Sequence, residues 1–249
     1  MKIANRIMSI AVVIISLFMV SFVKAQPPYD FVDLGTLGGD NSSAYCVNPY
    51  GQIVGVAQDA SGFFRATLFD PTGSGNNIDL GTLGGQNSCA FSINRFGQIV
   101  GTAQNSAGLY KAVVFDAAGE GNNIDLDVSG LAGTARSNGN FGQILGTFGD
   151  YAMDTEAMFF SSVADGNNVP LGEGVDLPVG WILQQANSVN DYGWIVGRAV
   201  NFAGISHAFL LTPTFGAYPP FTETPASGTY QGIIINFADL VTFADKWLE

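Results

Sequence analysis

DLGTLGGQNSCAFSINRFGQIVGTAQNSAGLYKAVVF, from Asp79 to Phe115, is almost the same text as DLGTLGGDNSSAYCVNPYGQIVGVAQDASGFFRATLF, which begins 46 residues earlier and runs from Asp33 to Phe69. Two weaker copies follow, so the chain contains four units. One leucine marks the matching position in each of them: Leu34, Leu80, Leu126 and Leu171. A period of about 46 residues is in the range of propeller blades, and the repeat therefore decides the architecture.

Each unit divides into four short apolar segments of the strand type. In the second unit the expected strands are Cys89–Ile93, Gln98–Ala103, Tyr110–Asp116 and Asn123–Leu126. Clusters of glycine and asparagine separate these segments, and 32 glycines in 249 residues are enough for many tight turns. We therefore predict an all-β fold in which every unit is one small sheet.

The first connection in each unit predicts a tight β-hairpin. Asn48-Pro-Tyr-Gly51 joins two apolar segments, and Asn94-Arg-Phe-Gly97 and Asn190-Asp-Tyr-Gly193 match it. The Asn side chain caps such a turn, and the Gly supplies the left-handed backbone of a type I turn with a bulge. The aromatic residues of these turns are expected to act as packing lids: Tyr50, Phe96, Phe141 and Tyr192.

The first strand of each unit is expected to line the axis of a ring. Small Ala, Ser and Cys residues alternate there with bulkier ones, and small residues suit a crowded centre. The third unit departs from this pattern, because Arg136 and Asn138 stand where the first unit has Tyr45 and Val47.

The two ends of the repeat region predict how the ring closes. The region begins with a segment of the fourth type, Phe31–Leu34, and ends with one of the third type, His207–Leu211. Pairing of these two segments would complete the last sheet and give a four-bladed β-propeller without open edges. The alternative is a β-solenoid or an open array, which needs capping units that the sequence does not show.

The flanking segments differ in composition from the repeats. Residues 1–25 combine Lys2 and Arg6 with an apolar run and a cleavage site after Ala25, which predicts a signal peptide and hence secretion or the cell surface. An uncleaved membrane anchor is the alternative. The four-repeat domain spans 26–214, and the Pro-rich residues 215–232 are expected to be a linker. Residues 233–249 predict an amphipathic helix, capped at Asn236, that could dock on a partner.

Charge and cysteine content limit the partners. The formal net charge is −12, with nine basic residues against 21 acidic ones, so nucleic acids and anionic membranes are poor partners. The only cysteines, Cys46 and Cys89, are offset by three positions within the repeat. An odd offset places side chains on opposite faces of equivalent strands, which predicts two free thiols rather than a disulfide.

The repeat resembles a known family. The DLGTLGG opening, the A-x-S-x-N-x-x-G-Q-I-V-G middle and the closing His207-Ala-Phe209 are similar to the HAF family of extracellular repeats over about residues 31–214. The resemblance implies an exported bacterial repeat protein and brings no catalytic activity or ligand with it. Ile235-Asn-Phe-Ala-Asp239-Leu resembles half of a dockerin-type repeat, but Gly228, Tyr230 and Gly232 occupy the positions of its calcium ligands.

No catalytic constellation is evident in the sequence. His207, the single histidine, shares its repeat position with Arg65, Lys111 and Glu156, which indicates a tolerant polar position. Asp33, Asp79 and Asp125 fall on the outermost strand, and Asp40 is expected to cap a loop. Glu120 and Asp165 lie in Gly-Asn-Asn loops, where a calcium site is an alternative, although no ordered calcium loop is present. We predict no cofactor.

These observations predict an exported, non-catalytic β-propeller that serves as a binding or surface-interaction module for a glycan or protein. Its loops carry Asn, Gln, Ser and aromatic residues suited to such ligands. Two alternatives stay open. One is a structural spacer tethered through the C-terminal helix, and the other is a glycoside hydrolase or lyase on a propeller scaffold.

Overall fold

The computed structural model describes residues 29–126, 130–149, 155–163 and 165–213. The chain divides into two compact units, Met1–Val32 and Asp33–Glu249, and every strand of the described residues lies in the second. The predicted signal peptide (1–25), linker (215–232) and C-terminal helix (233–249) lie outside the described residues.

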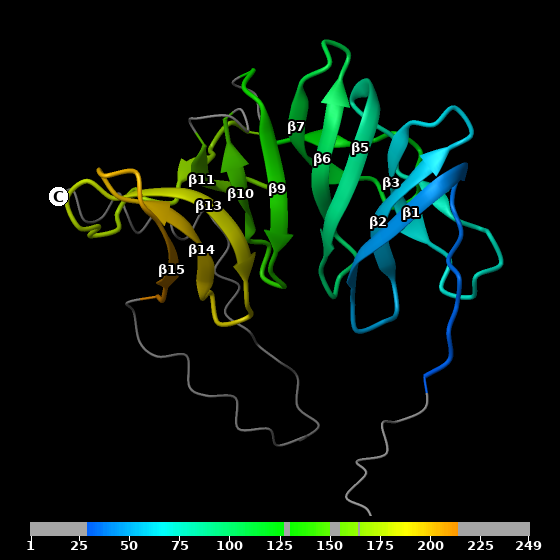
Figure 1. Ribbon diagram of the computed structural model, residues 1–249, viewed down its shortest axis with the longest axis horizontal. Coiled ribbons are helices and arrows are strands. Elements are labelled where there is room, and N and C mark those ends of the chain that lie inside the picture. Colours follow the sequence, from blue (N-terminus) through cyan, green and yellow to red (C-terminus); the bar gives the residue numbers. More distant parts are fainter. Residues whose placement is uncertain (1–28, 127–129, 150–154, 164, 214–249) are drawn as a thin grey trace, which may run out of the picture. The chain divides into compact units, whose positions relative to one another are not determined.

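Four antiparallel sheets form the second unit, one for each sequence repeat (Figure 1). The first sheet contains β1 (Gly38–Val47), β2 (Ile53–Asp59), β3 (Phe64–Phe69) and β4 (Ile78–Asp79). The second contains β5 (Gly84–Ile93), β6 (Ile99–Asn105), β7 (Tyr110–Phe115) and β8 (Ile124–Asp125). The third contains β9 (Gly133–Asn138), β10 (Ile144–Phe148), β11 (Glu156–Phe160) and β12 (Val169–Pro170). The fourth contains β13 (Ile182–Val189), β14 (Ile195–Val200) and β15 (Ser206–Leu211).

The strands pair in chain order within each sheet, which confirms the prediction of an all-β fold with one sheet per repeat. The first strand of the second unit is longer than predicted. It begins at Gly84 rather than Cys89, because Gly84 pairs with Asn105 and Ser88 pairs with Ala103 on β6.

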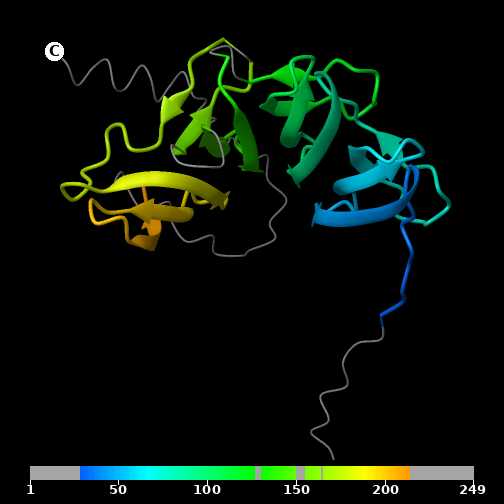
Figure 2. The ribbon, with the colours of Figure 1, turned by 45° about the horizontal axis from the view of Figure 1, so that its top comes forward.

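Three apolar clusters join consecutive sheets, which follow one another in chain order in both ribbon views (Figures 1 and 2). Between the first and second sheets, Val54, Ala66 and Leu80 pack against Ala90 of β5. The same four repeat positions meet again at the next two junctions, as Val100, Ala112, Leu126 and Ala135, and as Leu145, Ala157, Leu171 and Ala186. Burial of this apolar surface is the main term that stabilises the stack of sheets.

The hairpin turns have the predicted chemistry. Gly51 has a φ of +77°, and the equivalent glycines of the other units also have positive φ. The Oδ1 atom of Asn48 accepts hydrogen bonds from the backbone N–H groups of Tyr50 and Gln52, at 3.0 and 3.1 Å. Asn94 and Asn190 cap their turns in the same way.

The Gly-Asn-Asn loops attach each unit to the segment before it. The side-chain Nδ2 of Asn123 donates to the carbonyl oxygen of Leu80 at 2.8 Å, while its Oδ1 accepts from the backbone N–H of Asp116. Asn168 binds Leu126 in the same way, and Asn77 binds Leu34 at 2.7 Å. The N-terminal segment at Leu34 is therefore held as its repeat equivalents are.

The fourth sheet has three strands among the described residues, and Phe31–Leu34 forms no strand. Phe31 is 92% exposed. Ala208 of β15 and Ala44 of β1 are exposed, although their repeat equivalents are fully buried between sheets. The structure shows a repeat-like series of four sheets and does not show closure into a ring.

Candidate functional site

One residue of each first strand is a β-bulge. In the second unit, Ala90 pairs with Gly101 and Ser92 with Val100, so Phe91 has no partner on β6. The same register shift occurs at one position in every unit and defines the bulge residues: Tyr45, Phe91, Arg136 and Asn187. A bulge bends its strand and redirects a side chain, and bulges are enriched near binding and active sites.

The bulge residues of the first three units contact one another. The rings of Tyr45 and Phe91 are 5.9 Å apart with an angle of 36° between them. The guanidinium carbon of Arg136 lies 5.7 Å from the centre of the Phe91 ring, within the range of a cation–π interaction. Tyr45 is 51% exposed, whereas Phe91 and Arg136 are half-buried. An aromatic pair and a cation therefore form one continuous surface across three sheets.

The third unit has polar groups in this region that lack partners. Among the described residues, three buried side-chain atoms make no hydrogen bond: Arg136 Nε, Asn138 Oδ1 and Gln143 Oε1. In the first unit, Asn48 donates to the Oε1 atom of Gln52 at 2.7 Å. Gly139 replaces that asparagine in the third unit, so Gln143 loses its donor. A buried polar atom without a partner costs about 1–3 kcal/mol and calls for an explanation.

Neighbouring hairpin turns are linked by asparagine side chains. Asn48 Nδ2 donates to the carbonyl oxygen of Asn94 at 3.1 Å, and Asn94 Nδ2 donates to that of Gly139 at 3.2 Å. In the third turn, Asn140 continues the series by donating to Asp191 of the fourth unit at 2.7 Å. These bonds fix the spacing of the first strands, and with it the positions of the bulge residues.

The prediction that the turn aromatics are packing lids is wrong. They are exposed by 70%, 74%, 42% and 37%, respectively, at Tyr50, Phe96, Phe141 and Tyr192. In the first two units, the buried side chain of the turn asparagine bonds to a Gln side chain, so these polar groups rather than the aromatic ring occupy the interior of the turn. The aromatic rings consequently lie on the surface, where the guanidinium of Arg95 covers Phe96 at 5.6 Å.

Both cysteines are free, as predicted. The reasoning from their odd offset is nevertheless wrong, because the bulge residue between the two repeat positions changes which face the later side chains occupy. Cys46 donates weakly to the carbonyl oxygen of Ile93 at 3.8 Å. Burial raises the pKa of Cys89 to about 12, although the charge of Arg136 acts in the opposite direction. Cys89 therefore stays a neutral thiol at pH 7, unlike a nucleophilic cysteine.

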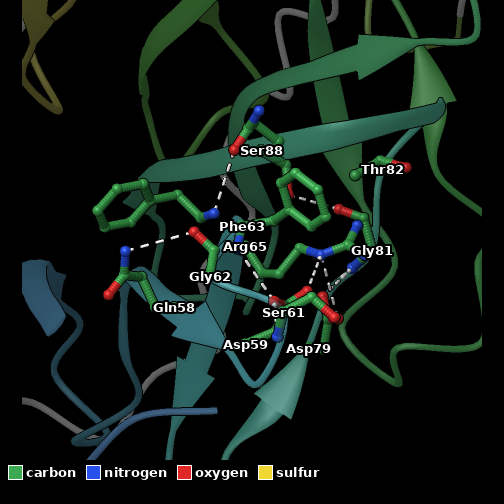
Figure 3. A network of polar contacts seen from close by, with 12 residues as sticks. Gln58, Asp59, Ser61, Gly62, Phe63, Arg65, Asp79, Gly81, Thr82 and Ser88 are labelled. Carbon is green, nitrogen blue, oxygen red and sulfur yellow. Dashed lines mark hydrogen bonds and ion pairs between the residues drawn. The ribbon is translucent and has the colours of Figure 1, made fainter. Parts of the chain in front are cut away.

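A network of polar contacts holds the chain together at the junction of the first two sheets (Figure 3). Arg65 Nε lies 3.1 Å from Asp59 and 3.8 Å from Asp79. Nearby, Ser88 Oγ accepts from the backbone N–H of Ala66 and donates to the carbonyl of Gly81. Desolvation acts to raise the pKa of Asp59, but the hydrogen bonds from Arg65 and two backbone N–H groups outweigh it, so the pKa lies below its ordinary value.

The other residues at the repeat position of Arg65 have different surroundings. Lys111 is 2% exposed and its Nζ donates to the carbonyl of Leu131 at 2.7 Å. The ring of His207 lies 5.1 Å from that of Trp181. Trp181 and Glu156 also line a shallow pocket of about 260 Å³ between the third and fourth sheets. None of the bulge residues lines this pocket.

The candidate carboxylates are not brought together. Asp33 and Asp79 each accept a hydrogen bond from the N–H group of the glycine two residues later. Asp165 caps its own loop at Asn167, and Glu120 lies in the corresponding loop of another sheet. Within the described residues, no group of three or more His, Cys, Asp or Glu side chains could hold a metal ion.

The part of the chain that the structure describes contains no helix of the length and hydropathy that would cross a bilayer. The sequence matches no protein-family model, and no curated protein shows significant similarity to it. The resemblance to HAF repeats therefore stays a prediction.

Proposed function

We propose that the protein is an exported, non-catalytic four-bladed β-propeller that binds an extracellular glycan or protein through its bulge residues. The observation that carries this proposal is the recurrence of a bulge at one repeat position with four different side chains: Tyr45, Phe91, Arg136 and Asn187. The bulge in the backbone is the same in all four units, whereas the side chain at the bulge differs, as suits a scaffold that presents a recognition surface.

Two exposed faces support closure of the ring. At each of the three observed junctions, an alanine of a first strand is buried against an alanine of the preceding sheet's third strand. Ala44 and Ala208 are the remaining members of these two sets, and both are exposed. Val196, equivalent to Val54, is 43% exposed beside Ala208. The last sheet and the first strand thus have complementary surfaces that match a fourth junction.

The repeat also specifies the register of the closing strand. Leu80 donates its backbone N–H to Ala66, and two residues away Leu68 pairs with Ile78. The equivalent residues at the closure are Leu210 and Val32, which are 52% and 46% exposed. Hydrogen-bonded antiparallel pairs have Cα atoms about 5.5 Å apart, a separation that a disulfide spans without strain.

A disulfide between these positions is the expected result of closure. The variant carries Val32→Cys and Leu210→Cys on residues 26–249, with Cys46→Ser and Cys89→Ser to remove the native thiols. Serine is already the residue at the equivalent positions of other units. We expect mild oxidation to convert most of the monomer into a species that migrates faster on a non-reducing gel.

The matched control joins Val32→Cys with Leu68→Cys. Leu68 is the equivalent of Leu210, but its partner strand is already in place. The control should give no intramolecular product. Closure within one chain is refuted if both variants cross-link equally, or if Val32 and Leu210 link only between two chains.

Binding is tested with residues 26–249 on arrays of glycans and of peptides. Tyr45→Ala removes an exposed ring from the bulge surface and should reduce the signal about 10-fold or more, because stacked aromatic residues dominate such contacts. Phe202→Ala is the control, since Phe202 is 88% exposed in the β14–β15 turn, outside the bulge surface. Equal loss in both variants, or no binding to any array, contradicts the proposal.

A further inference from the structure

We infer that the bulge residues bind a sugar that carries a carboxylate, with Arg136 pairing with the carboxylate and Tyr45 and Phe91 contacting the sugar ring. This inference rests on the proposed binding function and names the chemistry of its ligand. Three features carry the argument: a cation that lacks a protein partner, an aromatic surface beside it, and an exposed amide at the bulge of the next first strand.

Arg136 is a cation that the protein does not neutralise. It makes no ion pair among the described residues, although the chain has 21 acidic side chains to offer. Its Nε is buried without a hydrogen-bond acceptor, and its guanidinium lies over the face of Phe91. The planar guanidinium matches a carboxylate through two parallel hydrogen bonds, which is the strongest polar pairing open to it.

The aromatic pair favours a sugar over a bare carboxylate. Tyr45 and Phe91 lie side by side on the first strands, and Tyr45 is half-exposed. The exposed Tyr45 ring offers an apolar face beside the pair of Phe91 and the guanidinium, so a ligand that fits both needs an apolar ring face close to its charge. A hexuronic acid has this geometry, because its carboxylate is attached directly to the pyranose ring.

Amide side chains complete the chemistry. Asn187, the fourth bulge residue, is exposed on β13. Amides donate to and accept from hydroxyl groups, which sugars carry on most ring carbons. The net charge of −12 opposes dense polyanions, since their repulsion acts over the whole molecule. A glycan with isolated carboxylates fits this balance better than a heavily sulfated one.

The experiment is a titration of residues 26–249 with free sugars, followed by NMR. The ligands are hexuronic acids, the matching neutral hexoses, and the methyl esters of the acids, which keep the ring and lose the charge. An N-acetylated dipeptide with a free C-terminus supplies a carboxylate without a sugar ring. We expect the acids to bind about 10-fold or more tightly than hexoses, esters or dipeptide, as loss of a charge-assisted bidentate contact implies.

Two arginine variants provide the matched pair. Arg136→Met should abolish the preference for the acids without lowering the thermal midpoint, because it removes a buried Nε that has no partner. Arg95→Met is the control, because Arg95 also covers a Phe ring, at 5.6 Å, but lies on a hairpin turn. It should bind like the wild type.

The outcomes distinguish failure of the inferred ligand or site from failure of the proposed binding function. Equal binding of hexoses and acids, or of the dipeptide and the acids, overturns the inferred ligand and leaves the binding function standing. Unchanged acid binding by Arg136→Met overturns the inferred site. Absence of binding by sugars, esters and dipeptide to the folded protein overturns the inference, and silent arrays in addition overturn the proposed function.

Discussion

Gly101→Ala should destabilise the protein by about 3 kcal/mol, which lowers the thermal midpoint by about 6–12 °C in a domain of this size. Gly101 lies on β6 opposite the bulge at Phe91. A Cβ atom there would overlap the carbonyl oxygen of Cys89 and would lie 3.0 Å from the Cα of Ala90. Both neighbours are backbone atoms of a paired strand, so neither can move aside without breaking the ladder.

Gly172→Ala is the matched control. Gly172 does not have a positive φ, and the nearest atom to an added Cβ is Leu177 Cδ1 at 3.5 Å, an ordinary contact. Its free energy of unfolding should stay within about 0.5 kcal/mol of that of the wild type. Thermal unfolding followed by circular dichroism measures both variants. If Gly101→Ala unfolds at the wild-type temperature, the close approach of β5 and β6 at the bulge is wrong.

The sequence predicted the parts of the fold that depend on local chemistry. Asn48 and Gly51 specify their turn through side-chain capping and a positive φ, which are properties of single residues. The number of sheets followed from the repeat itself. Pairing within each sheet followed from short connections, because consecutive strands joined by tight turns are almost always neighbours.

The candidate site was harder to predict, because a bulge has no sequence signature of its own. Strict alternation predicts that every second side chain of a first strand lies on the same face, whereas the additional residue at Phe91 reverses that alternation beyond it. One signal was present: a glycine recurs on every second strand, at Gly55, Gly101, Gly146 and Gly197, opposite the distorted position. Together with the departure at Arg136, this glycine could have located the site.

The turn aromatics show a second limit of sequence reasoning. An aromatic residue such as Phe96 at a fixed repeat position fits a core lid and an exposed ring equally well. In the second unit, the buried side chain of Asn94 bonds to Gln98, and Phe96 lies exposed on the surface. Such a bond joins two side chains four residues apart, and neither residue alone indicates it.

Ala44→Glu is expected to destabilise the protein by about 3–5 kcal/mol if the ring closes. In a closed ring, Ala44 occupies the environment of Ala90, Ala135 and Ala186, which are fully buried between sheets. A carboxylate placed there has no cation to pair with and pays the penalty of an uncompensated buried charge. If the four sheets remain an open series, Ala44 is on the surface, and the change should stay within about 0.5 kcal/mol.

The loss of unfolding free energy in Ala90→Glu is the reference for this comparison, since Ala90 is buried at a junction that the structure shows directly. Ala208→Glu examines the opposite face of the same closure and should match Ala44→Glu. Chemical denaturation at two protein concentrations separates the remaining alternatives. A concentration-dependent loss places the first strand of one copy on the last sheet of another, because a head-to-tail contact that does not close within one chain must be made between chains. A loss that is independent of concentration leaves closure within one chain as the explanation, and its size relative to Ala90→Glu then measures how completely the fourth junction resembles the other three.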